Sequence, residues 1–164
     1  MRQLVTLIDR SPIGRANLDA ACRLAADTAA VVLAIHPIEV PDILPLDYPM
    51  GDIVKLAWAE CDRAHLMGQE FGVTLQPAVC QAHSVADAVV GFAGREAADA
   101  ICLAAPRGPR GWLRWLRGPG PAIMRSAPCP VLLVGDGWRP QAVDGSGGIP
   151  TRHAERTGET SESS

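Results

Sequence analysis

Five short apolar runs, separated by segments with helical periodicity, constrain this chain more than any other feature. They are LVTLI (4–8), AVVLAI (30–35), VTLQPAVC (73–80), AICLA (100–104) and PVLLV (130–134). Four of them are short, nearly continuous apolar runs, which are typical of strands buried on both faces, whereas residues 73–80 alternate enough between apolar and polar side chains to predict a strand. Strands that alternate with helices are usually parallel and joined by helical crossovers. We therefore predict an α/β doubly wound fold, a five-stranded parallel sheet with helices on both faces.

The segments between these runs carry helix signals. Ser11-Pro12 combines a capping residue with proline at the first helical position, which predicts a helix from there to residue 26. Ser84 has the spacing of a capping box with Asp87 and predicts a helix to about residue 97. Apolar spacing predicts further helices over 53–70 and 119–126, and a proline-punctuated loop over 37–49.

The predicted elements all fall within residues 1–135, which we interpret as one domain. Residues 136–164 are mostly Gly, Ser, Thr, Pro and charged residues, a composition that predicts a disordered C-terminal tail. Asp9 and Arg10 interrupt the first apolar run, so it does not resemble a signal peptide. No apolar run approaches the roughly 18 residues that span a bilayer. We expect a cytoplasmic protein without a membrane span.

Cysteine usage fits that compartment. The five cysteines are widely spaced and include no C-x-x-C pair, so neither a disulfide framework nor a zinc site is indicated. Cys102 and Cys129 lie in apolar surroundings and are interpreted as small buried side chains. No Ser-His-Asp or Cys-His arrangement is suggested by strand-end placement, and we expect no enzymatic activity.

The stretch APRGPRGWLRWLRGPGP, residues 105–121, is unusually rich in arginine, tryptophan, glycine and proline. Residues 100–135 hold five arginines and no acid, and a chain charge of −3 then leaves −8 for the remainder. Local basicity on an acidic body indicates a small anion or a local contact rather than nucleic acid. Trp112 and Trp115 suit a membrane surface or base stacking. We favour packing on their own domain or on a partner subunit.

The carboxyl ends of the first and fourth strands are the candidate ligand site. With the strand order 3-2-1-4-5, which we expect, these strands are neighbours and flank the switch point where ligands bind in such sheets. Asp9 follows the first strand, and Ala105 to Gly108 follow the fourth. Asp9 has a second interpretation, in which its carboxylate caps the turn into the first helix.

Four segments resemble the universal stress protein family: LVTLIDRSP, VLAIHPIEVP, ADAICLAAPRG and the closing RSAPCPVLLV. The resemblance covers residues 1–135 and implies an adenine-nucleotide α-hydrolase-like fold. ATP-binding members carry Gly-x2-Gly-x9-Gly-(Ser/Thr) after the fourth strand. The matching positions are Ala105, Gly108, Gly118 and Pro119, so the spacing is kept and two identities are lost. The resemblance further implies that Asp9 holds the ribose or base and that His36 borders the adenine. Pro37, next to His36, is a further candidate for cofactor binding. For His36 we favour a strand-end histidine whose hydrogen bonds are satisfied and which has no ligand role.

Pro119 and Pro121 remove backbone N–H donors where phosphate would meet a helix N-terminus. The neighbouring arginines supply charge, which does not rebuild a cradle of amides. We therefore expect a universal stress protein-type regulatory or binding protein of the stress response, non-catalytic, with nucleotide binding weakened or lost and no resident cofactor. The alternative is an ATP-binding stress protein with slow or no hydrolysis. The family implies a homodimer through the last strand and allows a protein or transporter partner.

Overall fold

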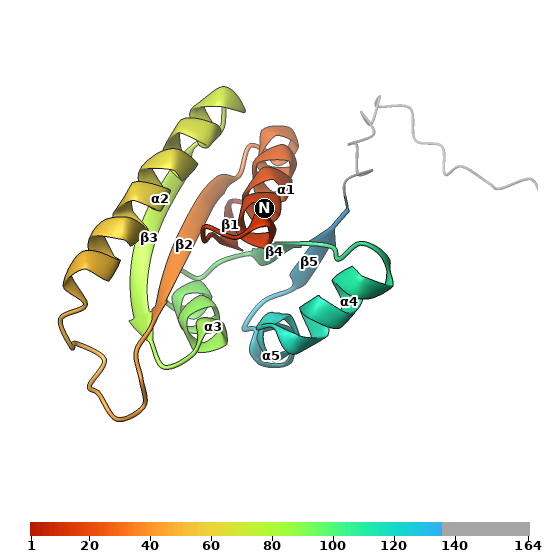
Figure 1. Ribbon diagram of the computed structural model, residues 1–164. Helices are drawn as coiled ribbons and strands as arrows, with labels where there is room; N and C mark the ends of the chain where they lie inside the picture. The colour runs from red at the N-terminus through yellow and green to blue at the C-terminus, as the bar shows by residue number, and fades with distance from the viewer. Residues whose placement is uncertain (136–164) are drawn as a thin grey trace, which may run out of the picture.

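The computed structural model describes residues 1–135. The predicted tail, 136–164, lies outside the described residues. The elements follow the predicted alternation (Figure 1): β1 (Gln3–Leu7), α1 (Pro12–Thr28), β2 (Val31–Glu39), α2 (Gly51–Glu70), β3 (Leu75–Ala82), α3 (Val85–Arg95), β4 (Ala100–Ala104), α4 (Gly108–Arg117), α5 (Gly120–Ser126) and β5 (Val131–Val134).

The strands form one parallel sheet in the order β3-β2-β1-β4-β5, which confirms the predicted fold and strand order. β1 is central, pairing with β2 on one side and β4 on the other. Figure 1 shows α2 along the β3 side of the sheet and the α4–α5 pair on the β5 side. The carboxyl ends of β1 and β4 therefore meet at one edge of the sheet, as the candidate site requires.

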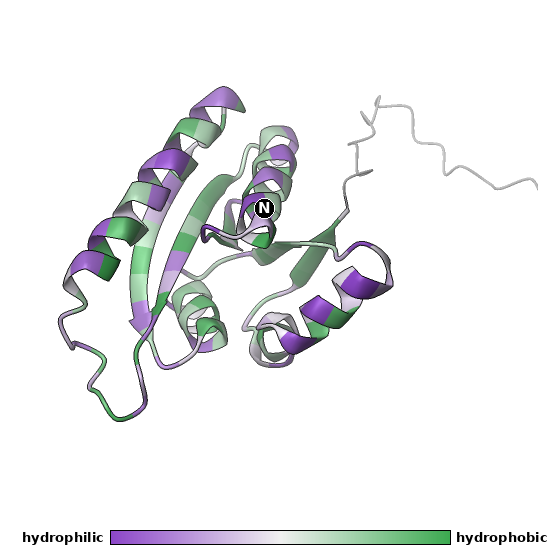
Figure 2. Ribbon diagram, viewed as in Figure 1, coloured by the Kyte–Doolittle hydropathy of each residue, from purple (hydrophilic) through white to green (hydrophobic). Residues whose placement is uncertain are grey.

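Two hydrophobic cores lie on opposite faces of the sheet. One packs α1 and α2 against the sheet, and the other packs α3 and α5 against its other face. Successive strand residues alternate between them, so Leu4 belongs to the first core and Val5 to the second, both without exposed surface. Each such buried side chain contributes about 1.5–3 kcal/mol. Figure 2 shows β4, β5 and most of β2 as hydrophobic, whereas β3 and the carboxyl end of β2 include hydrophilic residues.

The predicted helix starts at Ser11 and Ser84 are confirmed. The Ser11 side chain accepts a hydrogen bond from Gly14 N–H, with Pro12 opening α1. The Ser84 side chain accepts from Asp87 N–H at 3.0 Å at the start of α3. Each cap satisfies one of the N–H groups that a helix leaves unpaired at its N-terminus.

The predicted end of the second strand at Ile35 is wrong, because β2 continues through Pro37 to Glu39. Odd-numbered β2 residues bond toward β1, as the hydrogen bond from Ile8 N–H to the Ile35 carbonyl shows. The ladder of β1 and β2 ends at Leu7 and Ile35. The backbone nitrogen of Pro37 therefore points to the side where β1 has already ended. No ladder hydrogen bond is lost there, and proline is tolerated.

The structure also differs from the sequence interpretation after β4. The stretch interpreted as a phosphate loop is a ten-residue helix, α4, from Gly108 to Arg117. Gly108 adopts a φ of 60° at its start, a left-handed conformation that glycine adopts readily. Pro109 occupies the first turn, where a missing N–H costs little.

Candidate functional site

A buried asparagine joins β1 and β4 at the point where their pairing ends. The last paired residues are Thr6 and Cys102. Beyond them, Asn17 Nδ2 donates to the Leu7 carbonyl at 3.2 Å, and Asn17 Oδ1 accepts from Ala104 N–H at 2.8 Å. The side-chain amide thus replaces one pair of ladder hydrogen bonds, and it is 2% exposed. Asn17 therefore sets how far the two strand ends separate at the candidate site.

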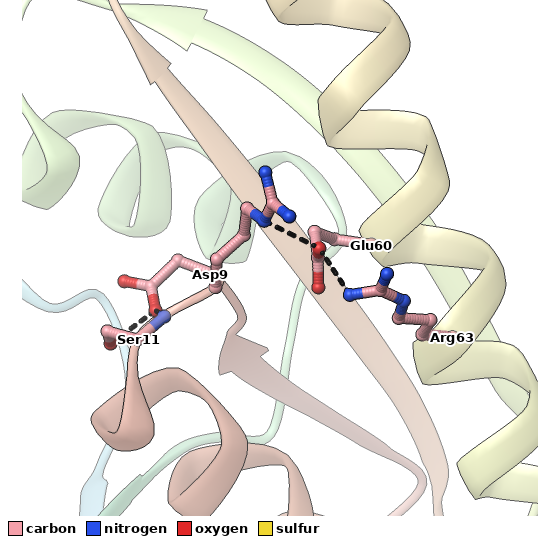
Figure 3. A network of polar contacts seen from close by, with 5 residues as sticks. Asp9, Ser11, Glu60 and Arg63 are labelled. Carbon is pink, nitrogen blue, oxygen red and sulfur yellow. Dashed lines mark hydrogen bonds and ion pairs between the residues drawn. The ribbon is translucent and has the colours of Figure 1, made fainter.

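Asp9 follows β1 and belongs to the turn into α1 (Figure 3). Asp9 Oδ1 accepts hydrogen bonds from Ser11 N–H at 2.7 Å and from the Ser11 hydroxyl. A Cβ placed on Gly14 would lie 2.5 Å from Asp9 N and 2.8 Å from Asp9 O, so only glycine permits this close approach. The carboxylate has the capping role that was one of its two interpretations. Its contact with a ribose or base stays a prediction.

The crevice beside the β1 and β4 ends is largely filled from α4 and α5. A Cβ on Gly120 would lie 2.7 Å from both Cζ2 and Nε1 of Trp115, so the indole rests directly on the Gly120 backbone. The cavity that remains has a volume of about 50 Å³, with Leu7, Leu103 and Arg114 among its lining residues. Cavities that bind small molecules usually measure about 300–1,000 Å³. The crevice as it stands does not fit a nucleotide.

Ala105 and Gly108, at the first two motif positions, line neither this crevice nor the other cavity beside Asp9. Ala105 N–H donates to the Val134 carbonyl at 2.9 Å and continues the pairing of β4 with β5. The φ angle of Ala105 is not positive, so the backbone conformation at this position does not require glycine.

Gly118 and Pro119, at the last two motif positions, do come together in the crevice wall. Gly118 ends α4, and its N–H already donates to the Trp115 carbonyl at 3.1 Å. Pro119 and Pro121 have no N–H to offer. Only Gly120 in this segment retains a backbone donor for a ligand, whereas a phosphate cradle uses several N–H groups that point to one place.

His36 and Pro37 project from opposite faces of the sheet, because side chains alternate along a strand. His36 follows Val32 and Ala34 of the α1–α2 core, so it points away from the face on which Leu7 and Leu103 lie. That it borders a bound adenine, as the resemblance implies, stays a prediction. The expectation that its hydrogen bonds are satisfied is wrong for one ring nitrogen, because His36 Nδ1 is buried without a hydrogen-bond partner among the described residues. Pro37 shares the face of the crevice but does not line it.

A second cavity, of about 390 Å³, lies between α1 and α2 beside Asp9. One of its walls is an ion-pair cluster (Figure 3). Glu60 Oε1 accepts from Arg10 Nε at 3.1 Å and from Arg63 Nη1 at 2.9 Å. Arg15 also lines the cavity. Because both arginine side chains are more than half exposed, each pair contributes at most about 1 kcal/mol. The Arg10 pair ties α2 to the β1–α1 turn, whereas Arg63 and Glu60 both lie on α2.

The described residues offer little nucleophilic or metal-binding chemistry. Burial raises the pKa of Cys22 and Cys61 to about 11 and that of Cys102 to about 12, so these thiols stay protonated at neutral pH. His83 Nδ1 lies 3.0 Å from the Val40 carbonyl. Within residues 1–135, no three His, Cys, Asp or Glu side chains are grouped to hold a metal ion.

Sequence reasoning missed two residues that determine the site. Asn17 was passed over inside an alanine-rich helix, although a polar residue on the buried face of a helix signals a buried hydrogen-bond network. Trp115 was interpreted as packing somewhere on the domain. Its actual position, in the crevice itself, depends on the fold of α4 against α5. No local sequence pattern predicts the contact between Trp115 and α5.

Comparison with known proteins agrees with this architecture. The model of the universal stress protein family matches residues 1–135. No curated protein sequence matches the chain. Within the described residues, no helix is both long enough and apolar enough to cross a bilayer.

Several solved structures share the fold. A universal stress protein from Archaeoglobus fulgidus in complex with dAMP is 18% identical, with a TM-score of 0.61 over 82% of this chain and 98% of that one. One from Arabidopsis thaliana with AMP bound is 14% identical, with a TM-score of 0.57 over 82% and 92%. A family protein from Burkholderia pseudomallei is 23% identical, with a TM-score of 0.59 over 80% and 94%.

Proposed function

The chain belongs to the universal stress protein family, and from that premise we propose a regulatory or binding protein of the stress response whose nucleotide site is weakened or lost. The observation that carries this proposal is the filled crevice. Trp115 rests on Gly120 and leaves about 50 Å³ beside the β1 and β4 ends. A ligand would have to displace the indole and lose the apolar burial that holds it there.

The second observation that supports a weakened nucleotide site is the small number of free backbone N–H donors around the crevice. Phosphate binding at a helix N-terminus draws on several free N–H groups. Here Pro119 and Pro121 have none, and the Gly118 amide is engaged with Trp115. Arg114 lines the crevice and supplies a positive charge. A single guanidinium gives attraction without the geometry that fixes a polyphosphate.

A second candidate function is nucleotide binding of ordinary strength, with slow or no hydrolysis. Structures of family members in complex with dAMP and AMP favour it. So does the cavity of about 390 Å³ beside Asp9, which has arginines in its wall and is large enough for a small ligand.

Titration calorimetry with ATP and the full chain separates these candidates. We expect no saturable binding by the wild-type protein up to about 1 mM ATP, corresponding to less than about 4 kcal/mol of binding free energy. Trp115→Ala enlarges the crevice, and we expect it to bind ATP more tightly than wild type. Leu113→Ala is the control, because Leu113 lies on the same helix, is 51% exposed and does not line the crevice.

A low-micromolar Kd for wild-type protein that Asp9→Ala weakens would overturn the first proposal in favour of the second. In that case ATP hydrolysis by the same samples becomes the next measurement. We propose that there is none, because Pro119 and Pro121 lack N–H groups and the Gly118 N–H is engaged, which leaves few donors to position a polyphosphate for attack by water.

The proposed assembly is a cytoplasmic homodimer through β5, with a partner protein such as a transporter as a further possibility. β5 lies at the edge of the sheet, and its four residues Val131–Val134 are apolar and half-buried. An apolar edge strand of this kind needs cover to avoid uncontrolled pairing. Sedimentation equilibrium tests the dimer: Leu133→Lys at the edge should shift the protein toward monomer.

A further inference from the structure

Helix α4 presents an apolar face that the described part of the protein does not cover. Trp112, Leu113 and Leu116 are 45%, 51% and 60% exposed. Their spacing of three and four residues places them on one side of the helix. The principal contact of α4 with another element is with α5. Figure 2 shows α4 at the periphery of the molecule, with hydrophilic and hydrophobic residues side by side along it.

The opposite side of α4 is cationic. Arg110, Arg114 and Arg117 follow one another at four and three residues and are all exposed, so they share a face. No acidic residue lies anywhere between residues 100 and 135. Exposed apolar side chains on α2, such as Leu66, lie among acidic residues, whereas exposed Met124 on α5 shares the acid-free segment with α4. On α4, arginine is thus segregated from tryptophan and leucine in a segment that has no acid to neutralise it.

An apolar face and a cationic face on one exposed helix restrict the kind of partner that α4 can bind. A second copy of the same face would bring arginines against arginines, which disfavours self-association. Nucleic acid would neutralise the arginines and leave the leucines in water. The interface of an anionic bilayer satisfies both sides, because tryptophan and leucine reach the acyl boundary while long arginine side chains reach lipid phosphates.

We propose that α4 is an interfacial helix that docks this protein on anionic lipid bilayers. Trp112, Leu113 and Leu116 enter the headgroup region, and Arg110 and Arg117 at their flanks bind lipid phosphates. The helix has ten residues, so the docking is reversible and depends on the lipid charge, unlike an anchor that spans the bilayer. The inference is independent of whether the crevice binds nucleotide.

The test is flotation of the full-length protein with two kinds of vesicle, at low and at high salt. One kind is pure phosphatidylcholine and the other a mixture of phosphatidylcholine and phosphatidylserine. We expect binding to the mixed vesicles at low salt and loss of it as salt screens the charges. Arg110→Ser and Arg117→Ser should each weaken binding about fivefold. Leu116→Ser should weaken it about tenfold.

Leu66→Ser is the matched control. Leu66 is 58% exposed, close to the 60% of Leu116, and it lies on α2. We expect it to bind vesicles as wild type does. Far-ultraviolet circular dichroism checks that each variant is folded, which the exposure of the substituted side chains favours.

Two outcomes would overturn the proposal. The first is that the wild-type protein does not bind the mixed vesicles at low salt. If Leu116→Ser then alters self-association in sedimentation equilibrium, the apolar face of α4 is an interface between copies of the protein and not a lipid-binding surface. The second is vesicle binding that Leu66→Ser weakens as much as Leu116→Ser does, because docking would then not be a property of α4.

Discussion

Asn17→Ala tests whether the buried amide holds the site edges of β1 and β4. The substitution removes the partners of the Leu7 carbonyl and the Ala104 N–H, now bonded at 3.2 and 2.8 Å. A buried polar group left unsatisfied costs about 1–3 kcal/mol. Alanine has a better helix propensity by only about 0.5 kcal/mol. We expect a net loss of about 2–5 kcal/mol, a large part of the roughly 5–15 kcal/mol that stabilises a domain.

Urea denaturation followed by circular dichroism measures this loss. With a slope of about 2 kcal/mol per molar urea, the midpoint should fall by about 1–2.5 M. Thr6→Val is the matched control at the same strand junction. It preserves the side-chain shape and removes a hydroxyl that donates to the Cys102 carbonyl at 2.9 Å, so we expect it to cost about 1 kcal/mol.

The reasoning is refuted if Asn17→Ala loses less than about 0.5 kcal/mol with an unchanged slope, since two unsatisfied buried groups cannot cost so little. It is also refuted if Thr6→Val is as damaging as Asn17→Ala. The destabilisation would then reflect general disturbance of the strand junction and not the two bonds of the amide.

Two further predictions concern the ends of β1. Gly14→Ala should lower the free energy of unfolding in urea by about 1–3 kcal/mol, because its Cβ would meet the Asp9 backbone at 2.5 Å. Gly91→Ala is the control on α3, where the added Cβ would meet the mobile end of the Arg95 side chain at 3.4 Å, so it should be neutral or stabilising by helix propensity. At the other end, hydrogen bonds from Gln3 and Arg2 N–H lower the pKa of Asp99 below its ordinary 3.8. Asp99→Asn should therefore lower the urea midpoint at neutral pH, and the difference should vanish as the pH falls through the folded-state pKa; a pH-independent difference would contradict this.

The sequence determined the fold of this chain, because its signals are local and repeated. Four of the strands contain a short apolar run, the third was recognised by alternation, and the helix starts predicted at Ser11 and Ser84 are capping patterns. Such patterns predict secondary structure without knowledge of distant contacts. The alternation of strands and helices then restricts the topology to a parallel sheet with crossovers. The position of Asp9 at the switch point follows from that order alone.

The state of the site was decided only by tertiary contacts. The spacing of the motif positions from Ala105 to Pro119 predicted a phosphate loop, whereas residues Gly108–Arg117 of this segment form the helix α4. Trp115 and Gly120 are five residues apart, and nothing in their spacing reveals that the indole would lie on that glycine. Asn17 contacts β4 across 87 residues of sequence. Local sequence patterns predict which segments form helices or strands and which residues are buried. Whether a cavity is filled depends on which side chains from separate elements come together in it. For that physical reason, the crevice could be located from the sequence and its contents could not.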